Sequence, residues 1–190
     1  MNKVGVMVDV SHISDDAFYQ AVEISEVPVI ASHSSLRKYT PGFERNMSDD
    51  MLKALAENEG VIQINFGSSF VTAKAGAWGK QLKSTKESAK EQGTKLSNDF
   101  DAAYRAKNPY PFASLEQVLE HIDHVVELIG IDYVAIGSDY DGLDCLPKSW
   151  NDCMDHMLIV ERLDSRGYSE KEIEKIMGYN VMRVLEDIWS

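Results

Sequence analysis

The sequence is poor in cysteine and has no long apolar run. Its two cysteines, Cys145 and Cys153, lie eight residues apart, a spacing typical of neither a disulfide framework nor a zinc knuckle. We expect both to be free thiols in a reducing compartment. No apolar run approaches the roughly 18 residues that a membrane-spanning helix needs, and the first residues lack the apolar core and cleavage site of a signal peptide. We therefore expect a cytoplasmic protein that has no membrane partner.

Basic residues are scarce as well. The chain has 19 Lys and Arg against 31 Asp and Glu, which gives a formal net charge of −12 over 190 residues. Such an acidic chain is poorly suited to binding the phosphate backbone of a nucleic acid or an anionic membrane surface. Apolar residues make up 44% of the sequence, which is sufficient for a buried core. The length predicts a single domain over residues 1–190.

What the sequence does contain is an alternation of apolar runs and helical patterns. Four short runs are continuous rather than alternating, which is typical of parallel strands covered on both faces. They span residues 4–10, 28–33, 61–66 and 133–139. A helical pattern follows each run, so the order β-α-β-α-β-α-β-α predicts an α/β fold with a parallel sheet.

Serines and glycines indicate where the helices begin and end. Ser14 and Ser48 each precede two aspartates, which the helix dipole favours in a first turn. Gly60 and Gly130 are expected to follow the ends of two helices. Two capping boxes are predicted from their spacing, at Ser114 with Gln117 and at Ser169 with Glu172. Further helices are predicted near residues 150–166 and over about 180–189.

One stretch departs from the alternation. Residues 67–112 form an insertion between the third strand run and the helix that begins after Ser114. Within it, residues 73–107 carry eight basic and four acidic residues, so this segment is net positive in an acidic chain. Its content of Lys, Ala, Ser and Gln predicts an exposed helical arm, and a lid or wall over a site at the strand ends is the alternative.

Three polar residues that carry chemistry follow the predicted strands. In parallel α/β folds, ligands bind at the C-terminal ends of the strands. The first run ends at His12, the second at His33 and the fourth at Asp139, and a serine precedes each of them. Imidazole and carboxylate groups together are the ordinary ligands of zinc and similar metals. The pattern favours a metal site with His12 and His33 as ligands, and a nucleophilic Ser-His pair is the rival interpretation.

Strand geometry disfavours that rival. Neighbouring residues of a strand point to opposite faces, so we do not expect Ser11 and His12 to act on each other. Asp139 is expected to face the site, where a carboxylate beside a metal-bound water accepts and returns a proton. Arg45 lies in the loop after the second run and has the side chain that holds a carboxylate through two parallel hydrogen bonds. A plain surface arginine is the alternative for Arg45, and turn chemistry explains Asp141.

The remaining histidines are expected to be solvated surface residues. His121 and His124 fall in the middle of a predicted helix, where the His-x-Asp string at 121–123 cannot form one site because positions i and i+2 do not face each other. His156 lies in the helix after the fourth run. Asp9, three residues before His12, is expected to point away from the site and not to be a ligand.

Six motifs in order resemble the membrane (renal) dipeptidase family of zinc peptidases over nearly the whole chain. They are "MVDVSH", "PVIASHSS", "RNMSDDML", "VIQINF", "LEQVLEHIDHVVELIGIDYVAIGSDYDG" and "YSEKEIEKIMGYNVMRVLE". The resemblance implies a (β/α)₈ metal-dependent hydrolase that cleaves dipeptides at a binuclear zinc site. It implies that His12 and His33 bind one zinc and that Arg45 holds the substrate carboxylate. Asp139 then lies near the bridging water and the substrate amine.

The chain departs from this family in one important respect. It supplies four predicted strands, which resemble the last four of the eight in the barrel. The early His-x-Asp motif, the metal-bridging Glu and the substrate-binding His of the family all belong to the first half. We therefore expect a partial chain with an incomplete site, which forms a homodimer or is complemented by an N-terminal half. An inactive half-barrel that only assembles with a partner is one alternative, and another amidohydrolase or deaminase is the second.

Overall fold

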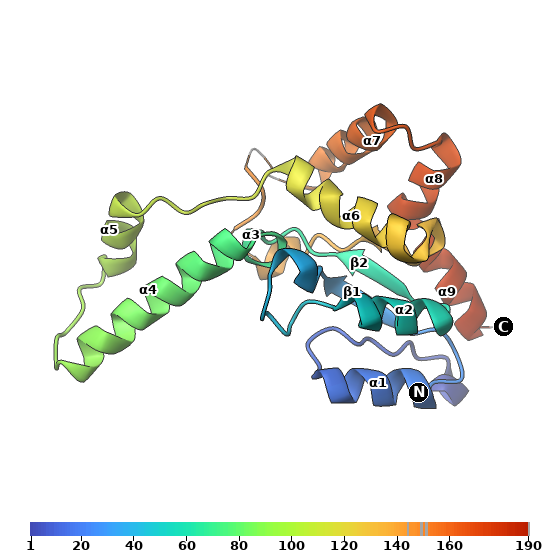
Figure 1. The fold of residues 1–190 in the computed structure, drawn as a ribbon, viewed down its shortest axis with the longest axis horizontal. Helices are drawn as coiled ribbons and strands as arrows, with labels where there is room; N and C mark the ends of the chain where they lie inside the picture. Colours follow the sequence, from blue (N-terminus) through green and yellow to red (C-terminus); the bar gives the residue numbers. More distant parts are fainter. Residues whose placement is uncertain (144, 149, 151, 190) are drawn as a thin grey trace.

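The computed structural model describes residues 1–143, 145–148, 150 and 152–189. Its centre is a parallel sheet of three strands, β1 (Ile30–Ser34), β2 (Val61–Ile64) and β3 (Val134–Ile136), in the order β1-β2-β3. Ile30 pairs with Val61, and Ile62 pairs with Val134. Helices follow the strands and cover the sheet (Figure 1). The predicted α/β class with parallel βα units is confirmed.

The strand predicted over residues 4–10 is wrong. Asn2–Val4 form a short 3-10 helix, and only Asp9 makes a bridge to β1, opposite Ile30. Val4 is 75% exposed and Val6 46% exposed, so these apolar side chains lack the cover that their continuous run predicted. Within the described residues no strand pairs with the outer edge of this segment, and its pairing with β1 is limited to the single bridge at Asp9, so it does not form a regular strand.

Helices occur where the serine caps predicted them. Ser14 accepts a hydrogen bond at the start of α1 (Asp15–Ile24), Ser48 does so at α2 (Asp49–Glu57), and capping boxes open α6 (Leu115–Ile129) and α8 (Glu170–Glu174). The C-terminal region also contains α7 (His156–Ser165), a π-helical turn at Lys175–Tyr179 and α9 (Asn180–Trp189). In the described ranges no helix is both long and apolar enough to cross a bilayer.

The end of α2 differs from the prediction by one residue. Glu59, not Gly60, adopts the left-handed conformation, with φ 59°. The N–H of Glu59 bonds to the carbonyl of Ala56, and the N–H of Gly60 bonds to that of Leu55, both at 2.9 Å. Gly60 is required for a different reason, because a Cβ there would lie 2.5 Å from the carbonyl oxygen of Val29. The glycine therefore allows close packing at the start of β2.

The sheet is apolar on both faces, as the continuous runs predicted. On one face, residues of β2 such as Ile62 and Ile64 pack against α2 and α6. On the other face, Ile30 of β1 and Val61 of β2 lie against Val184 of α9. The two ends of the chain meet at α9, where Trp189 Nε1 donates to the carbonyl of Gly5 at 3.2 Å.

The insertion is helical and projects from the body of the molecule (Figure 1). It consists of α3 (Ser68–Val71), α4 (Ala73–Glu91) and α5 (Phe100–Lys107). Ala75, near its base, is the buried residue of α4. An ion pair of 2.7 Å between Lys86 and Asp101 joins α5 to α4, and Trp78 packs its ring against Tyr104. The exposed arm predicted from composition is confirmed.

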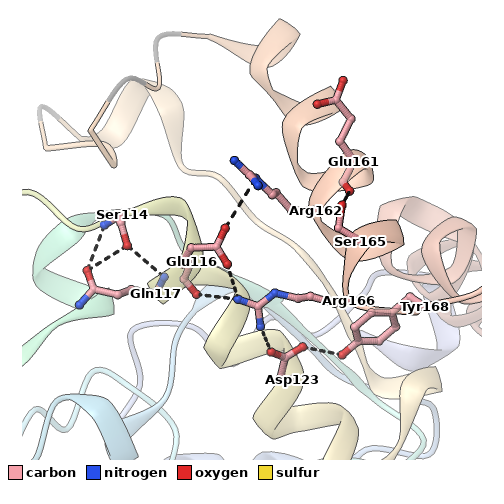
Figure 2. A network of polar contacts seen from close by, with 9 residues as sticks. All are labelled: Ser114, Glu116, Gln117, Asp123, Glu161, Arg162, Ser165, Arg166 and Tyr168. Atoms are coloured by element: carbon pink, nitrogen blue, oxygen red, sulfur yellow. Dashed lines mark hydrogen bonds and ion pairs between the residues drawn. The ribbon is translucent and has the colours of Figure 1, made fainter.

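A polar network attaches α7 to α6 (Figure 2). Arg166, just after α7, donates to Glu116 Oε2 at 2.6 Å and also pairs with Asp123. The hydroxyl of Tyr168 donates to the other oxygen of Asp123 at 2.8 Å. Partial burial, followed by the neighbouring Asp123 carboxylate, raises the pKa of Tyr168 above its ordinary value. The network holds the C-terminal end of α7 against α6.

The surface positions predicted for His121 and His124 are wrong. His121 is fully buried, and its Nδ1 accepts from the N–H of Leu36 at 3.1 Å while its Nε2 donates to the carbonyl of Val71 at 3.1 Å. The nearly buried His124 lies between Lys38 and Asp49, at 2.8 Å and 3.0 Å. Both histidines border the apolar stripe of α6, where a polar ring can reach neighbouring backbone groups. His121 thus ties the segment after β1 to the base of the insertion.

The buried His121 makes stability depend on pH. Burial lowers its pKa from 6.5 to about 4, so the folded protein holds this ring neutral where the unfolded chain takes up a proton. The free energy of unfolding that His121 contributes is fully present above pH 6.5 and is lost as the pH falls toward 4, by about 3 kcal/mol. Urea unfolding of the wild type and of His121→Gln across this range measures it. The variant should lose this part of the slope, and equal slopes would contradict the assignment.

Candidate metal centre

Two histidines meet at the C-terminal edge of the sheet. His33 lies in β1, and His12 follows the bridged segment at Asp9, in a left-handed conformation with φ 67°. Their Nε2 atoms are 2.8 Å apart, and their ring centroids are 4.9 Å apart. The structure therefore brings together the two residues that the sequence predicted as metal ligands, and they approach through the same ring atom.

A bulge in β1 sets the direction of His33. Ala31 pairs with Ile62 and Ser34 with Ile64, so β1 has one residue more than β2 over this interval. Such a bulge changes which way side chains point and is common near functional sites. As a result, Ser32 and His33 do not simply alternate between faces, and Ser32 Oγ lies 2.7 Å from His33 Nδ1.

Asp9 lies behind this pair rather than beside His12. Its Oδ2 is 2.5 Å from Ser32 Oγ, and its Oδ1 accepts from the N–H groups of Ser11 and Ser32 at 2.9 Å and 3.1 Å. Burial raises the pKa of Asp9, but the hydrogen bonds, led by that from Ser32, outweigh this effect and leave the pKa below its ordinary value. Asp9 is thus a carboxylate at neutral pH, and Ser32 connects it to the His33 ring through two hydrogen bonds.

The Ser11 hydroxyl contacts residues of β1 and not the His12 ring. Its hydroxyl accepts from the N–H of His33 at 3.2 Å and lies 3.5 Å from Ser34 Oγ. The neighbouring serine therefore does not form a nucleophilic pair with His12, although the predicted reason, alternation along a strand, does not apply because Ser11 and His12 lie outside any strand and His12 is left-handed.

Arg45 reaches the same edge from the loop after β1. Its Nη1 donates to Ser34 Oγ at 2.7 Å, and its Nη2 donates to the carbonyl of His33 at 2.6 Å. Its Nε is buried and has no hydrogen-bond partner among the described residues. Burial lowers the pKa of Arg45, and the charges of Asp139 and Asp9 oppose that effect, so the guanidinium remains a cation near two carboxylates.

Asp139 completes the cluster from the end of β3. It is left-handed, with φ 61°, and its Oδ2 accepts from Asn65 Nδ2 at 2.9 Å. Asn65 is fully buried, and its Oδ1 accepts from the N–H of Gly67 at 2.7 Å, which fixes its amide orientation. A side chain at Gly142 would overlap Asp139 Oδ1, so the glycine leaves room for the carboxylate. Asp141 is exposed in the turn, as predicted.

The electrostatics favour a neutral His12 imidazole. Loss of hydration lowers the pKa of His12, and the positive charge of Arg45 and the neighbouring His33 lower it further, against the opposing carboxylates of Asp139 and Asp9. A neutral ring can offer a lone pair to a metal. His12 is exposed and His33 half-buried, so both can be reached from solvent.

This donor set fits part of a zinc site. Two imidazole nitrogens that bind one tetrahedral zinc at about 2.0–2.1 Å lie about 3.3 Å apart. The observed 2.8 Å separation is within about half an ångström of that value. Among the described residues, however, no group of three His, Cys, Asp or Glu side chains could hold a metal ion. The arrangement supplies two imidazole donors, with the Arg45 guanidinium and the Asp139 carboxylate near them.

Comparison with known proteins identifies the family. The sequence profile of peptidase family M19, described as membrane dipeptidase, matches residues 1–189. The chain belongs to the membrane dipeptidase family. Among curated relatives, dipeptidase tcpJ of Claviceps purpurea is 34% identical over 188 residues, and dipeptidase 3 of Mus musculus is 27% identical over 188 residues. The M19 resemblance expected from the six motifs is thereby confirmed.

Solved M19 structures share the fold. The probable dipeptidase PvdM from Pseudomonas aeruginosa has a TM-score of 0.81 at 26% identity, covering 98% of this chain and 51% of that one. A metallo peptidase from Rhodobacter sphaeroides, solved with a phosphinate mimic of the dipeptide L-Ala-D-Ala, has a TM-score of 0.74 at 26% identity, covering 99% of this chain and 44% of that one. The present 190-residue chain spans 36% of the length of tcpJ and 31% of the length of dipeptidase 3.

Three polar residues around the cluster escaped the sequence analysis. Asp9 was expected to face away, Ser32 was noted only as the serine before His33, and Asn65 was not singled out. A serine directly before each histidine and a lone Asp inside an apolar run are the signals that could have indicated Ser32 and Asp9. Their partners depend on the bulge in β1 and on the loop after β2, which the residue pattern does not show.

The contact between Asn65 and Asp139 predicts a measurable coupling. Hydrogen bonds to a charged group contribute about 1.5–3 kcal/mol, so the double-mutant cycle Asn65→Ala with Asp139→Ala should give a coupling free energy of about 1–2 kcal/mol in urea unfolding. The exposed Asp141 provides a matched control, and the cycle of Asn65→Ala with Asp141→Ala should be additive. Equal coupling in both cycles would contradict a specific role for Asn65.

Proposed function

We propose that this chain forms part of a zinc-dependent dipeptidase. The observation that carries the proposal is that the His12 and His33 Nε2 atoms converge at the C-terminal edge of the sheet in a chain that belongs to the M19 family. In this proposal the two histidines bind one zinc ion, Arg45 holds the substrate carboxylate, and Asp139 lies near the reacting water and the substrate amine. The substrate class is dipeptides.

The groups of this chain have complementary roles in such a reaction. Zinc, when bound, would act as a Lewis acid and would lower the pKa of a water molecule, so that a nucleophile for the peptide carbonyl is available at neutral pH. Arg45 keeps the Nη hydrogens that it does not donate to Ser34 and His33 for an anionic ligand. Asp139, oriented by Asn65, can accept a proton and return it to the departing amine.

The proposed centre needs ligands beyond these two histidines. A catalytic zinc typically has three protein ligands, and the described residues bring two to this point. We propose that the missing ligands come from another polypeptide segment, either an N-terminal half of the barrel or a second copy of the chain. Exposed apolar residues beside the first bridge, Val4 and Val6, support an assembly that covers this edge.

The match to family M19 favours the dipeptidase over the deaminase alternative. A likeness to an amidohydrolase from Pseudomonas aeruginosa, at 21% identity and a TM-score of 0.67, concerns the fold alone. Release of ammonia from nucleosides, with no cleavage of dipeptides under the same conditions, would reverse this preference.

Zinc binding tests the ligand assignment. We expect the purified chain to bind Zn²⁺, and His12→Ala and His33→Ala each to weaken binding at least about tenfold, because each removes one of two donors. Isothermal titration with a competing chelator measures the affinity. His156→Ala is the matched control, since that ring packs among Phe66, Tyr140 and Trp150. Unchanged affinity in both pair variants would contradict the assignment.

Activity of the isolated chain tests whether the centre is incomplete. We expect the 190-residue chain with added Zn²⁺ to hydrolyse L-Ala-L-Ala at most weakly, because two histidines leave the ion under-coordinated by protein. Release of free alanine measures the rate, and light scattering on the same sample gives the oligomeric state. Robust zinc-dependent hydrolysis by a monomer would contradict an incomplete centre, although it would support the dipeptidase class.

A further inference from the structure

The hydrogen bonds behind the histidine pair form a continuous chain. Asp9 Oδ2 lies 2.5 Å from Ser32 Oγ, Ser32 Oγ lies 2.7 Å from His33 Nδ1, and His33 Nε2 lies 2.8 Å from His12 Nε2. Every link is within hydrogen-bond distance, and each joins side chains that the bulge in β1 and the bridge at Asp9 bring together.

The chemistry of these groups fixes the direction of the chain. An ionised carboxylate only accepts hydrogen bonds, so the single hydroxyl hydrogen of Ser32 is donated to Asp9. Ser32 Oγ then has lone pairs alone to offer to His33, so the hydrogen of that bond belongs to His33 Nδ1. A neutral imidazole carries one ring hydrogen, and therefore His33 Nε2 has a free lone pair.

His12 is held differently. With a lone pair on His33 Nε2, the bond between the rings requires the hydrogen on His12 Nε2. Beyond this bond, the His12 ring has no hydrogen-bond partner among the described residues, and His12 is exposed. His12 can therefore change its tautomer, moving its hydrogen from Nε2 to Nδ1 through solvent with no change in charge, whereas His33 cannot without breaking the bond to Ser32.

We propose that Asp9 and Ser32 are positioning residues that hold His33 in the Nδ1–H tautomer, with Nε2 preset as a metal donor, while His12 adapts when the metal arrives. Outer hydrogen-bond partners of metal-bound histidines act in this way in other metal sites, and their loss typically weakens metal affinity by 10–100-fold. The tautomer itself does not require a metal, but its use as a donor rests on the proposed zinc site.

Nuclear magnetic resonance of the metal-free protein, labelled with ¹⁵N at histidine, tests the tautomer directly. Two-bond ¹⁵N–¹H correlations above pH 8 should show a protonated Nδ1 and an unprotonated Nε2 for His33. Ser32→Ala should shift His33 toward the Nε2–H form, and Ser32→Thr, which retains the hydroxyl, should restore the Nδ1–H form. Asp9→Ala should also release the tautomer, because it frees the Ser32 hydroxyl to donate to His33.

Ser11→Ala is the matched control. It removes a serine hydroxyl of the same cluster that bonds to the His33 backbone N–H and not to the ring, so the Nδ1–H form should persist. The same variants are then titrated with Zn²⁺, where Ser32→Ala should weaken binding about 10–100-fold and Ser32→Thr should not.

The outcomes separate this inference from the proposed function. A wild-type His33 in the Nε2–H form, or a tautomer that Ser32→Ala leaves unchanged, overturns the positioning role even if zinc binds. The expected tautomers with no zinc binding by the wild type would support the Asp9–Ser32–His33 chain and overturn the proposed metal site. Equal zinc affinity of the wild type and Ser32→Ala would overturn the use of the preset donor.

Discussion

The pairing of β1 with β2 determines where the histidine pair of the candidate metal centre lies. The extra residue in β1 between Ala31 and Ser34 places Ser32 and His33 in contact and leaves the His33 carbonyl to accept from Arg45. Asp9 forms a parallel bridge with Ile30 of the same strand, and this bridge brings His12 to the C-terminal edge of the sheet. A change of one residue in this register would move each of these side chains, because the period of a strand is two.

Buried polar groups keep the segment after β1 in place. His121 accepts from the N–H of Leu36, and the buried Asn46 accepts from the N–H of Ser35 while donating to the carbonyl of Phe70. Each bond satisfies a backbone group that burial would otherwise leave unpaired. They connect the loop that carries Arg45 to the base of the insertion and to α6. The precision of the site therefore depends on polar contacts within the core and not on the apolar packing alone.

Much of the fold follows from local patterns in the sequence. Serine caps at Ser14, Ser48 and Ser114 place helix starts correctly, since capping depends on residues within one turn. The strand expected over residues 4–10 fails because strand formation needs a paired neighbour, which lies outside any local window. The burial of His121 was missed for the same reason, as its partners are backbone groups distant in sequence.

The candidate site shows the same division between local and distant information. The residue types at the ends of the strand runs predicted that His12, His33 and Asp139 lie close together. Residue types could not show that Asp9 supports His33 instead of facing away, because this depends on the bulge. Nor could they show that Asn65 holds Asp139, a contact between residues 74 apart in the chain. The candidate site residues were recognisable from the sequence, whereas the groups that orient them required the structure.

Arg45 links the proposed metal and substrate sites. Its Nη2 donates to the carbonyl of His33, and its Nη1 donates to Ser34, so it fixes the backbone of a proposed metal ligand. In the proposed function, its remaining Nη hydrogens bind the substrate carboxylate. A lysine could not replace it in both roles, because an ammonium is a single point of charge, whereas the planar guanidinium donates in several fixed directions at once. The arrangement therefore couples the position of His33 to the place where a carboxylate would bind, and Arg45 connects the two.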